Sequence, residues 1–117
     1  MPYITPTPAP LLRTTTHSTS VTADTDILAD AIGISAGRTV ALLRIEVAFS
    51  AGSLLSARIA RAGITVEVSL NSGNALSAPA LYIFDIILHS GDTLNLRYGA
   101  SATLLVCRIH EVGSQAA

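Results

Sequence analysis

The chain has 117 residues, a net charge of −1 at pH 7 and no lysine, so all seven of its positive charges are arginine. This length suits one domain with a substantial core, and the balanced charge excludes the clustered basic face that binds nucleic acid. Hydrophobic residues make up 50% of the chain. Because this content exceeds what a small monomer needs, we expect apolar surface to be buried against copies of the chain or another protein.

Three further classes are excluded by local features. Cys107 is the only cysteine, which rules out an internal disulfide framework and a cysteine zinc site. The first residues, MPYITPTPAPLL, lack the basic and apolar regions of a secretory signal. No apolar run reaches the ~18 residues of a membrane helix, so we expect no membrane partner.

Residues 1–22 are expected to form an extended N-terminal arm. Four of the five prolines lie at positions 2, 6, 8 and 10, where they forbid a helix. Two interpretations remain: a disordered tail, or an arm laid on a neighbouring subunit through Tyr3, Ile4, Leu11 and Leu12. The segment 13–22 is rich in threonine and serine and suits an extended edge strand. A sandwich domain is expected at 23–113 and a short tail at 114–117.

Residues 24–34, DTDILADAIGI, are the only stretch with a helical pattern of apolar residues. The stretch is short and Gly33 interrupts it, so a strand or an irregular crossing is an equal alternative. Asp24, Asp26 and Asp30 resemble the start of a calcium loop, but no further ligands and no closing glutamate follow. We interpret them as helix-capping or turn-stabilising residues.

Period-two alternation predicts two strands in the middle of the chain, at 39–50 and 64–70. A less regular strand at 54–60 lies between them, and the polar loop 71–79 then offers a contact surface. The apolar rows are Leu43, Ile45, Val47 and Phe49 in the first strand, and Ile64, Val66, Val68 and Leu70 in the second.

Residues 81–112, LYIFDIILHSGDTLNLRYGASATLLVCRIHEV, predict three successive strands with turns near Gly91 and Gly99. Together with the earlier segments this gives seven or eight strands without a helical period. We therefore predict an all-β fold: a single-domain antiparallel β-sandwich.

The turn at Gly91-Asp92 allows two arrangements. If its strands pair as a hairpin with matched apolar faces, Asp85 stands opposite Arg97 as a cross-strand ion pair. If the turn crosses between two sheets, the two residues lie on outer faces of different sheets and cannot touch. An ion pair of Asp85 with Arg97 or Arg108 is expected, within the subunit or across an interface. The outer face of these strands is predicted to meet neighbouring subunits; it carries Asp85, Asn95 and Arg97 among Leu81, Ile83 and Ile87.

Patterns typical of catalysis or metal binding are not found. The chain has no G-x-S-x-G, P-loop or G-x-G-x-x-G motif. His17, His89 and His110 are far apart and have no second metal-type ligand at close spacing. Asp85 has no second carboxylate predicted near it, and Cys107 alternates with apolar residues, which predicts a buried thiol. We expect no enzymatic activity, no cofactor and no metal.

Two resemblances add to this interpretation. The Gly91-Asp92 turn, the alternating TLNLRY and the final ATLLVCRI are similar to the closing strands of C1q/TNF-like jelly rolls. The proline-rich arm, the NSG loop and the absence of lysine and of cysteine pairs resemble small virion proteins of tailed bacteriophages, of the capsid decoration (cement) type. Both resemblances imply a jelly-roll-like sandwich and a homotrimer. The second also implies a virion location and a major capsid or tail protein as partner.

These observations predict a non-enzymatic structural protein of a virion, a homotrimer that stabilises a capsid or tail. The expected interface residues are Tyr3, Ile4, Leu11, Leu12, Asp85, Arg97 and Arg108. The alternative is a carbohydrate- or receptor-binding module of a tail tip or surface assembly. Such a module presents exposed aromatic rings to sugars, and its candidates beyond the two phenylalanines are Tyr3, Tyr82 and Tyr98.

Overall fold

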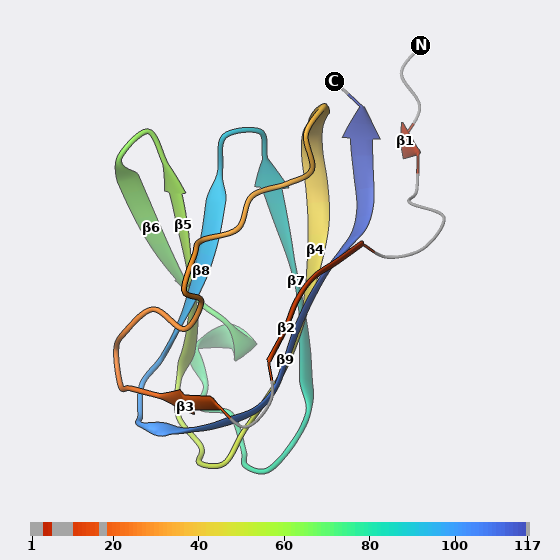
Figure 1. The fold of residues 1–117 in the computed structure, drawn as a ribbon. Helices are drawn as coiled ribbons and strands as arrows, with labels where there is room; N and C mark the ends of the chain where they lie inside the picture. The colour runs from red at the N-terminus through yellow and green to blue at the C-terminus, as the bar shows by residue number, and fades with distance from the viewer. Residues whose placement is uncertain (1–3, 6–10, 17–18, 117) are drawn as a thin grey trace.

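The chain folds into a sandwich of two antiparallel β-sheets, which confirms the predicted fold class (Figure 1). This computed structural model describes the backbone of residues 4–5, 11–16 and 19–116 and the side chains of residues 20–113. The strands described are β1 (Ile4–Thr5), β2 (Leu11–Thr16), β3 (Thr19–Val21), β4 (Arg38–Phe49), β5 (Leu55–Arg61), β6 (Ile64–Ser69), β7 (Tyr82–His89), β8 (Thr93–Tyr98) and β9 (Ala102–Ala116). A 3₁₀ turn, η1 (Asn71–Gly73), begins the polar loop.

The two sheets differ in size and in how their edges are covered. In the larger sheet β7, β4 and β9 lie side by side, and β1, β2 and β3 pair in succession with the far edge of β9. The smaller sheet holds β6, β5 and β8 in that order. The edge strand predicted in segment 13–22 is therefore present as the end of β2 and as β3, on the chain's own β9.

The predicted apolar row of β4, Leu43 to Phe49, lies between the sheets together with the inward-facing residues of β8. Alternate residues of β4 and β8 face each other there, as the period of two requires. Phe49 at the end of β4 stacks on Tyr98 at the end of β8, with ring centroids 3.7 Å apart and planes inclined by 4°. The largest fully buried side chains include Leu43, Ile45, Leu55, Leu88, Leu94, Leu96, Leu104 and Ile109.

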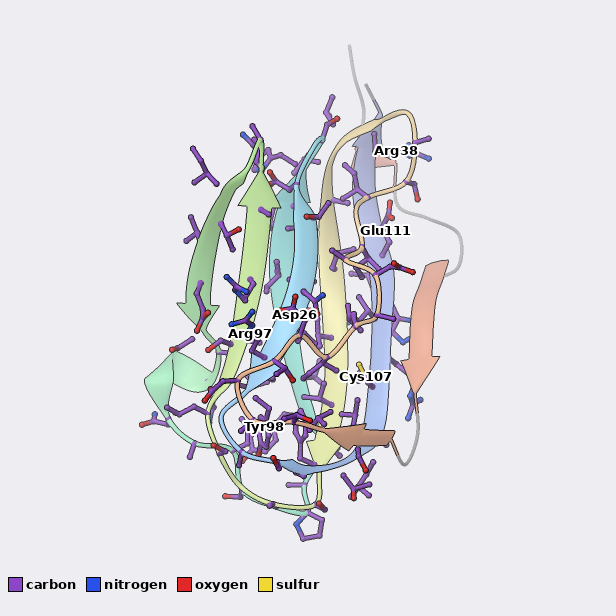
Figure 2. The ribbon with its side chains drawn as sticks, turned by 60° about the vertical axis from the view of Figure 1, so that its left-hand side comes forward. Asp26, Arg38, Arg97, Tyr98, Cys107 and Glu111 are labelled. Carbon is purple, nitrogen blue, oxygen red and sulfur yellow. The ribbon has the colours of Figure 1, made fainter. Side chains whose placement is uncertain are left out.

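The Gly91-Asp92 turn crosses between the sheets, because β7 belongs to the larger sheet and β8 to the smaller. This is the second of the two arrangements that the sequence allowed, so Asp85 and Arg97 do not pair within the subunit. Asp85 does not pair with Arg108 within the subunit either, because β4 lies between β7 and β9. Asp85 instead pairs with Arg44, its neighbour across the β4–β7 ladder. Arg97 pairs with Asp26, and Figure 2 shows these two side chains pointing toward each other.

Residues 24–34 form an irregular crossing and not a helix, so helix capping by Asp24, Asp26 or Asp30 is excluded. The segment runs along the free edge of β8, where isolated bridges join Asp26 to Arg97 and Ile32 to Leu94. Between the bridges it bulges. The side chain of the buried Asn95 fills this bulge: its Oδ1 accepts from the Leu28 backbone N–H at 2.9 Å, and its Nδ2 donates to the Leu28 carbonyl at 3.0 Å.

Candidate functional site

One side of the sandwich is closed and the other is open. On the closed side, the crossing segment pairs with β8, and its Ser35 donates hydrogen bonds from N and Oγ to the Glu111 carboxylate of β9. The crossing segment thus links β8, the edge of the smaller sheet, to β9 of the larger sheet. The opposite edges, β6 and β7, share the other side, where the connection of residues 70–81 joins them and buries Leu70 and Leu76 in the core. Along the strands themselves no described segment is paired with either free edge. Figure 1 shows β5 and β6 leaning away from the larger sheet at the end where they turn.

The inward face of the smaller sheet continues on β6, past the area where its side chains are buried in the core. In the β5–β6 ladder, Val68 lies opposite Ala57 and Val66 opposite Ile59. Ala57 is fully buried and Ile59 packs against the core, and directly opposed residues share a face of the sheet. We call Ile64, Val66 and Val68 the β6 row; their side chains face inward yet are 71%, 56% and 44% exposed.

A shallow hollow of about 340 Å³ opens beside this row. Ile59, Ile64 and Val66 line it, and Arg61 and Asp92 stand at one end. The Arg61 Nε binds Asp92 Oδ1, which joins the β5–β6 turn to the β7–β8 turn. The start of β6 and the end of β7 therefore lie together, so Ile64 and Ile87 are at the same end of the sandwich.

The edge strand of the larger sheet carries a second apolar row on its outer face. Leu81, Ile83 and Ile87, which we call the β7 row, are 53%, 54% and 59% exposed. Asp85 interrupts the row, and Arg44 binds it through two hydrogen bonds of 2.8 and 3.0 Å. These bonds from Arg44 lower the pKa of Asp85, so the pair stays ionised and neutral overall at pH 7.

The expected interface residues do not gather in one place. Tyr3 lies outside the described residues; Ile4, Leu11 and Leu12 are described only by their backbone in β1 and β2. Asp85 lies beside the β7 row, whereas Arg97 is on the other sheet under Asp26. Arg108 is half-buried on β9, and its buried Nε has no hydrogen-bond partner among the described residues. Asn95, expected on an outer face that meets neighbouring subunits, is buried under the chain's own crossing segment.

The remaining chemistry of the described residues is modest. No group of three metal-binding side chains occurs among them. His89 is exposed, His110 lies 2.9 Å from a Glu46 carboxylate oxygen, and His17 lies outside the described residues. The Cys107 thiol is fully buried, as predicted, and burial raises its pKa to about 11, which keeps it protonated and unreactive at neutral pH.

Sequence reasoning missed two features of this arrangement. Glu111 follows the apolar ATLLVCRI run and is 2% exposed, held by Ser35 from the crossing segment. No local signal marks it, because its partner is far away in sequence. The β6 row was predicted as a strand face, but its exposure depends on how far the opposite sheet extends.

Asp92 provides a pH test of the turn that joins the two edges. Arg61 first, and then the His89 backbone N–H, lower the pKa of Asp92 through hydrogen bonds. A depressed native pKa adds stability that is present above the unfolded value, about 4, and is lost as pH falls through the native one. In urea unfolding from pH 7 to pH 3, Asp92→Asn should lower the free energy of unfolding at pH 7, and its difference from wild type should shrink below about pH 4.

The exposed Asp30 supplies the control, and Asp30→Asn should leave the free energy of unfolding nearly unchanged across this range. A difference between Asp92→Asn and wild type that is constant from pH 7 to pH 3 would contradict a carboxylate held ionised at the turn.

Comparison of the chain with models of known protein families, with curated proteins and with solved structures finds no match. The described part of the chain holds no helix whose length and apolar character would let it cross a membrane.

Proposed function

We propose that the protein is a non-enzymatic structural subunit of a virion, which assembles with copies of itself and stabilises a capsid or tail. One observation carries the assembly. Seven large hydrophobic side chains are exposed in the described part of the chain, and six of them belong to the β6 and β7 rows. Apolar groups scattered singly are normal on a surface, whereas large apolar side chains gathered on one side are typical of an interface.

The virion location is supported by the resemblance of the proline-rich arm, the NSG loop and the absence of lysine and of cysteine pairs to small virion proteins of tailed bacteriophages. The partner in this proposal is a major capsid or tail protein, whose joints the subunit covers. The resemblance implies three copies. A sugar-binding role has less support, because Tyr98 is buried against Phe49 and Tyr82 is half-buried, with its hydroxyl accepting from the Ser77 N–H.

The proposal is tested on particles. Virions purified from cells that produce this protein should contain it at a fixed ratio to the major capsid or tail protein, as measured by quantitative mass spectrometry. The ratio should survive a density gradient. Recovery of the protein only in the soluble fraction, with none in purified particles, would contradict a virion role.

A further inference from the structure

The β6 and β7 rows face in the same direction. The β6 row is on the inner face of the smaller sheet, and the β7 row is on the outer face of the larger one. In a sandwich the inner face of one sheet and the outer face of the other point the same way, offset by the sheet spacing of about 10 Å. The open side is therefore a step: the β6 row is its lower level, the β7 row its upper level, and the free edge of β7 stands between them.

A step of this kind is complementary to itself. A two-fold axis parallel to the strands brings the upper level of each copy onto the lower level of the other. We propose that the open side binds a second copy of this chain in this way, with the β6 row of each copy packed on the β7 row of its partner. The inference rests on the self-assembly in the proposed function and names the surface and its symmetry.

The chemistry of the two levels favours a second copy over a charged partner. Each row consists of three aliphatic side chains on one face of its strand, and the β6 row begins where the β7 row ends, at the same end of the sandwich. The charges beside them are already paired within the subunit, as Arg44 with Asp85 and Arg61 with Asp92. Two identical copies can therefore meet without repulsion between these charges. In the dimer, the β6 row of one copy and the β7 row of its partner cover each other's apolar surface, which water contacts in the single subunit.

Charge substitutions at the most exposed position of each row test the contact. Ile64→Glu and Ile87→Arg should each keep the fold, because both side chains stand largely in water in the subunit. Each alone should weaken self-association by at least ~100-fold, since a buried charge without a partner costs several kcal/mol. Thr65→Glu is the matched control: it is exposed on the opposite face of β6 and should leave association unchanged.

Mixing the two variants distinguishes this contact from any other. In an Ile64→Glu copy paired with an Ile87→Arg copy, one β6–β7 contact holds Glu against Arg and the other is wild type. The mixture should therefore regain dimers that neither variant forms alone, measured by sedimentation velocity with one variant labelled. Absence of mixed dimers would overturn the reciprocal contact.

Cysteine cross-linking provides a second measurement that does not depend on weakened variants. Cys107 is buried, so Ile64→Cys and Ile87→Cys introduce the accessible thiols among the described residues. Oxidation of an equimolar mixture should give a disulfide-linked heterodimer in preference to either homodimer. Homodimers alone would contradict the pairing of the β6 row with the β7 row.

The two proposals fail on different results. A wild-type trimer would contradict the two-fold contact and leave the proposed function standing, whereas failure to enter virions would overturn the proposed function alone.

Discussion

Phe49→Ala should lower the free energy of unfolding by about 3–5 kcal/mol, because it empties the site of a fully packed aromatic ring in the core. Phe49 and Tyr98 are 2% and 1% exposed, and their stacked rings connect the last residue of β4 in one sheet to the last residue of β8 in the other. Stability of such a domain is about 5–15 kcal/mol in total, so the change removes a large share of it. Urea unfolding at one protein concentration measures the difference.

Two milder changes check that the packing of the rings is the cause. Phe49→Leu retains most of the buried volume and should cost clearly less than Phe49→Ala. Tyr98→Phe retains the ring and removes the hydrogen bond that its hydroxyl donates to the Ala51 carbonyl, which should cost about 1 kcal/mol. Equal losses in all three variants would show that the stack does not hold the sheets together.

Asn95→Leu should lower the free energy of unfolding by about 2–4 kcal/mol, although it places a larger apolar side chain at a buried position. Asn95 is the hydrogen-bond partner of the Leu28 N–H and C=O, and leucine leaves both groups without one. Each buried polar group that loses its partner costs about 1–3 kcal/mol. The crossing segment should also detach from β8, which hydrogen exchange at Ile27 and Leu28 measures.

Thr93, half-buried on the same face of β8, gives the control for this experiment. Thr93→Val should change the free energy of unfolding by less than about 1 kcal/mol, because Thr93 has no such role toward the crossing segment. Protection of the Leu28 amide that persists in Asn95→Leu would contradict the assignment of Asn95 as the residue that fixes the crossing segment.

The strands and the core were predictable because the period of two is a local signal. The row from Leu43 to Phe49 alternates with polar residues, and all of it is buried in the structure. The same alternation at Ile64, Val66 and Val68 predicted a strand but not its exposure. Burial of a strand face depends on the sheet opposite, and the larger sheet ends at β7 before it covers β6.

The partners of Asp85 and Arg97 could be predicted only as alternatives that depended on the course of the turn between their strands. Asp85 and Arg97 are close in sequence and suit a hairpin, but the Gly91-Asp92 turn passes between the sheets and separates them. Their partners, Arg44 and Asp26, come from segments 41 and 71 residues away. Asn95 was expected on a face that meets neighbouring subunits, because nothing near it in sequence indicates that residues 24–34 of the same chain lie over it.

The outer face of β7 was predicted to meet neighbouring subunits, and its exposed aliphatic row is consistent with that hypothesis. The structure adds the β6 row at a lower level on the same side. A single apolar face permits several symmetries, whereas two levels that fit each other restrict the contact to a two-fold axis along the strands.

The mass of the native 117-residue chain in solution tests the central claim most directly. At micromolar concentration, native mass spectrometry should show twice the 12.1 kDa mass of the chain, or a larger even multiple. The dimer should fall to the chain mass in Ile64→Glu and Ile87→Arg and return when these variants are mixed. A wild-type protein that stays at 12.1 kDa at this concentration would contradict the claim that a second copy covers the open side of the sandwich.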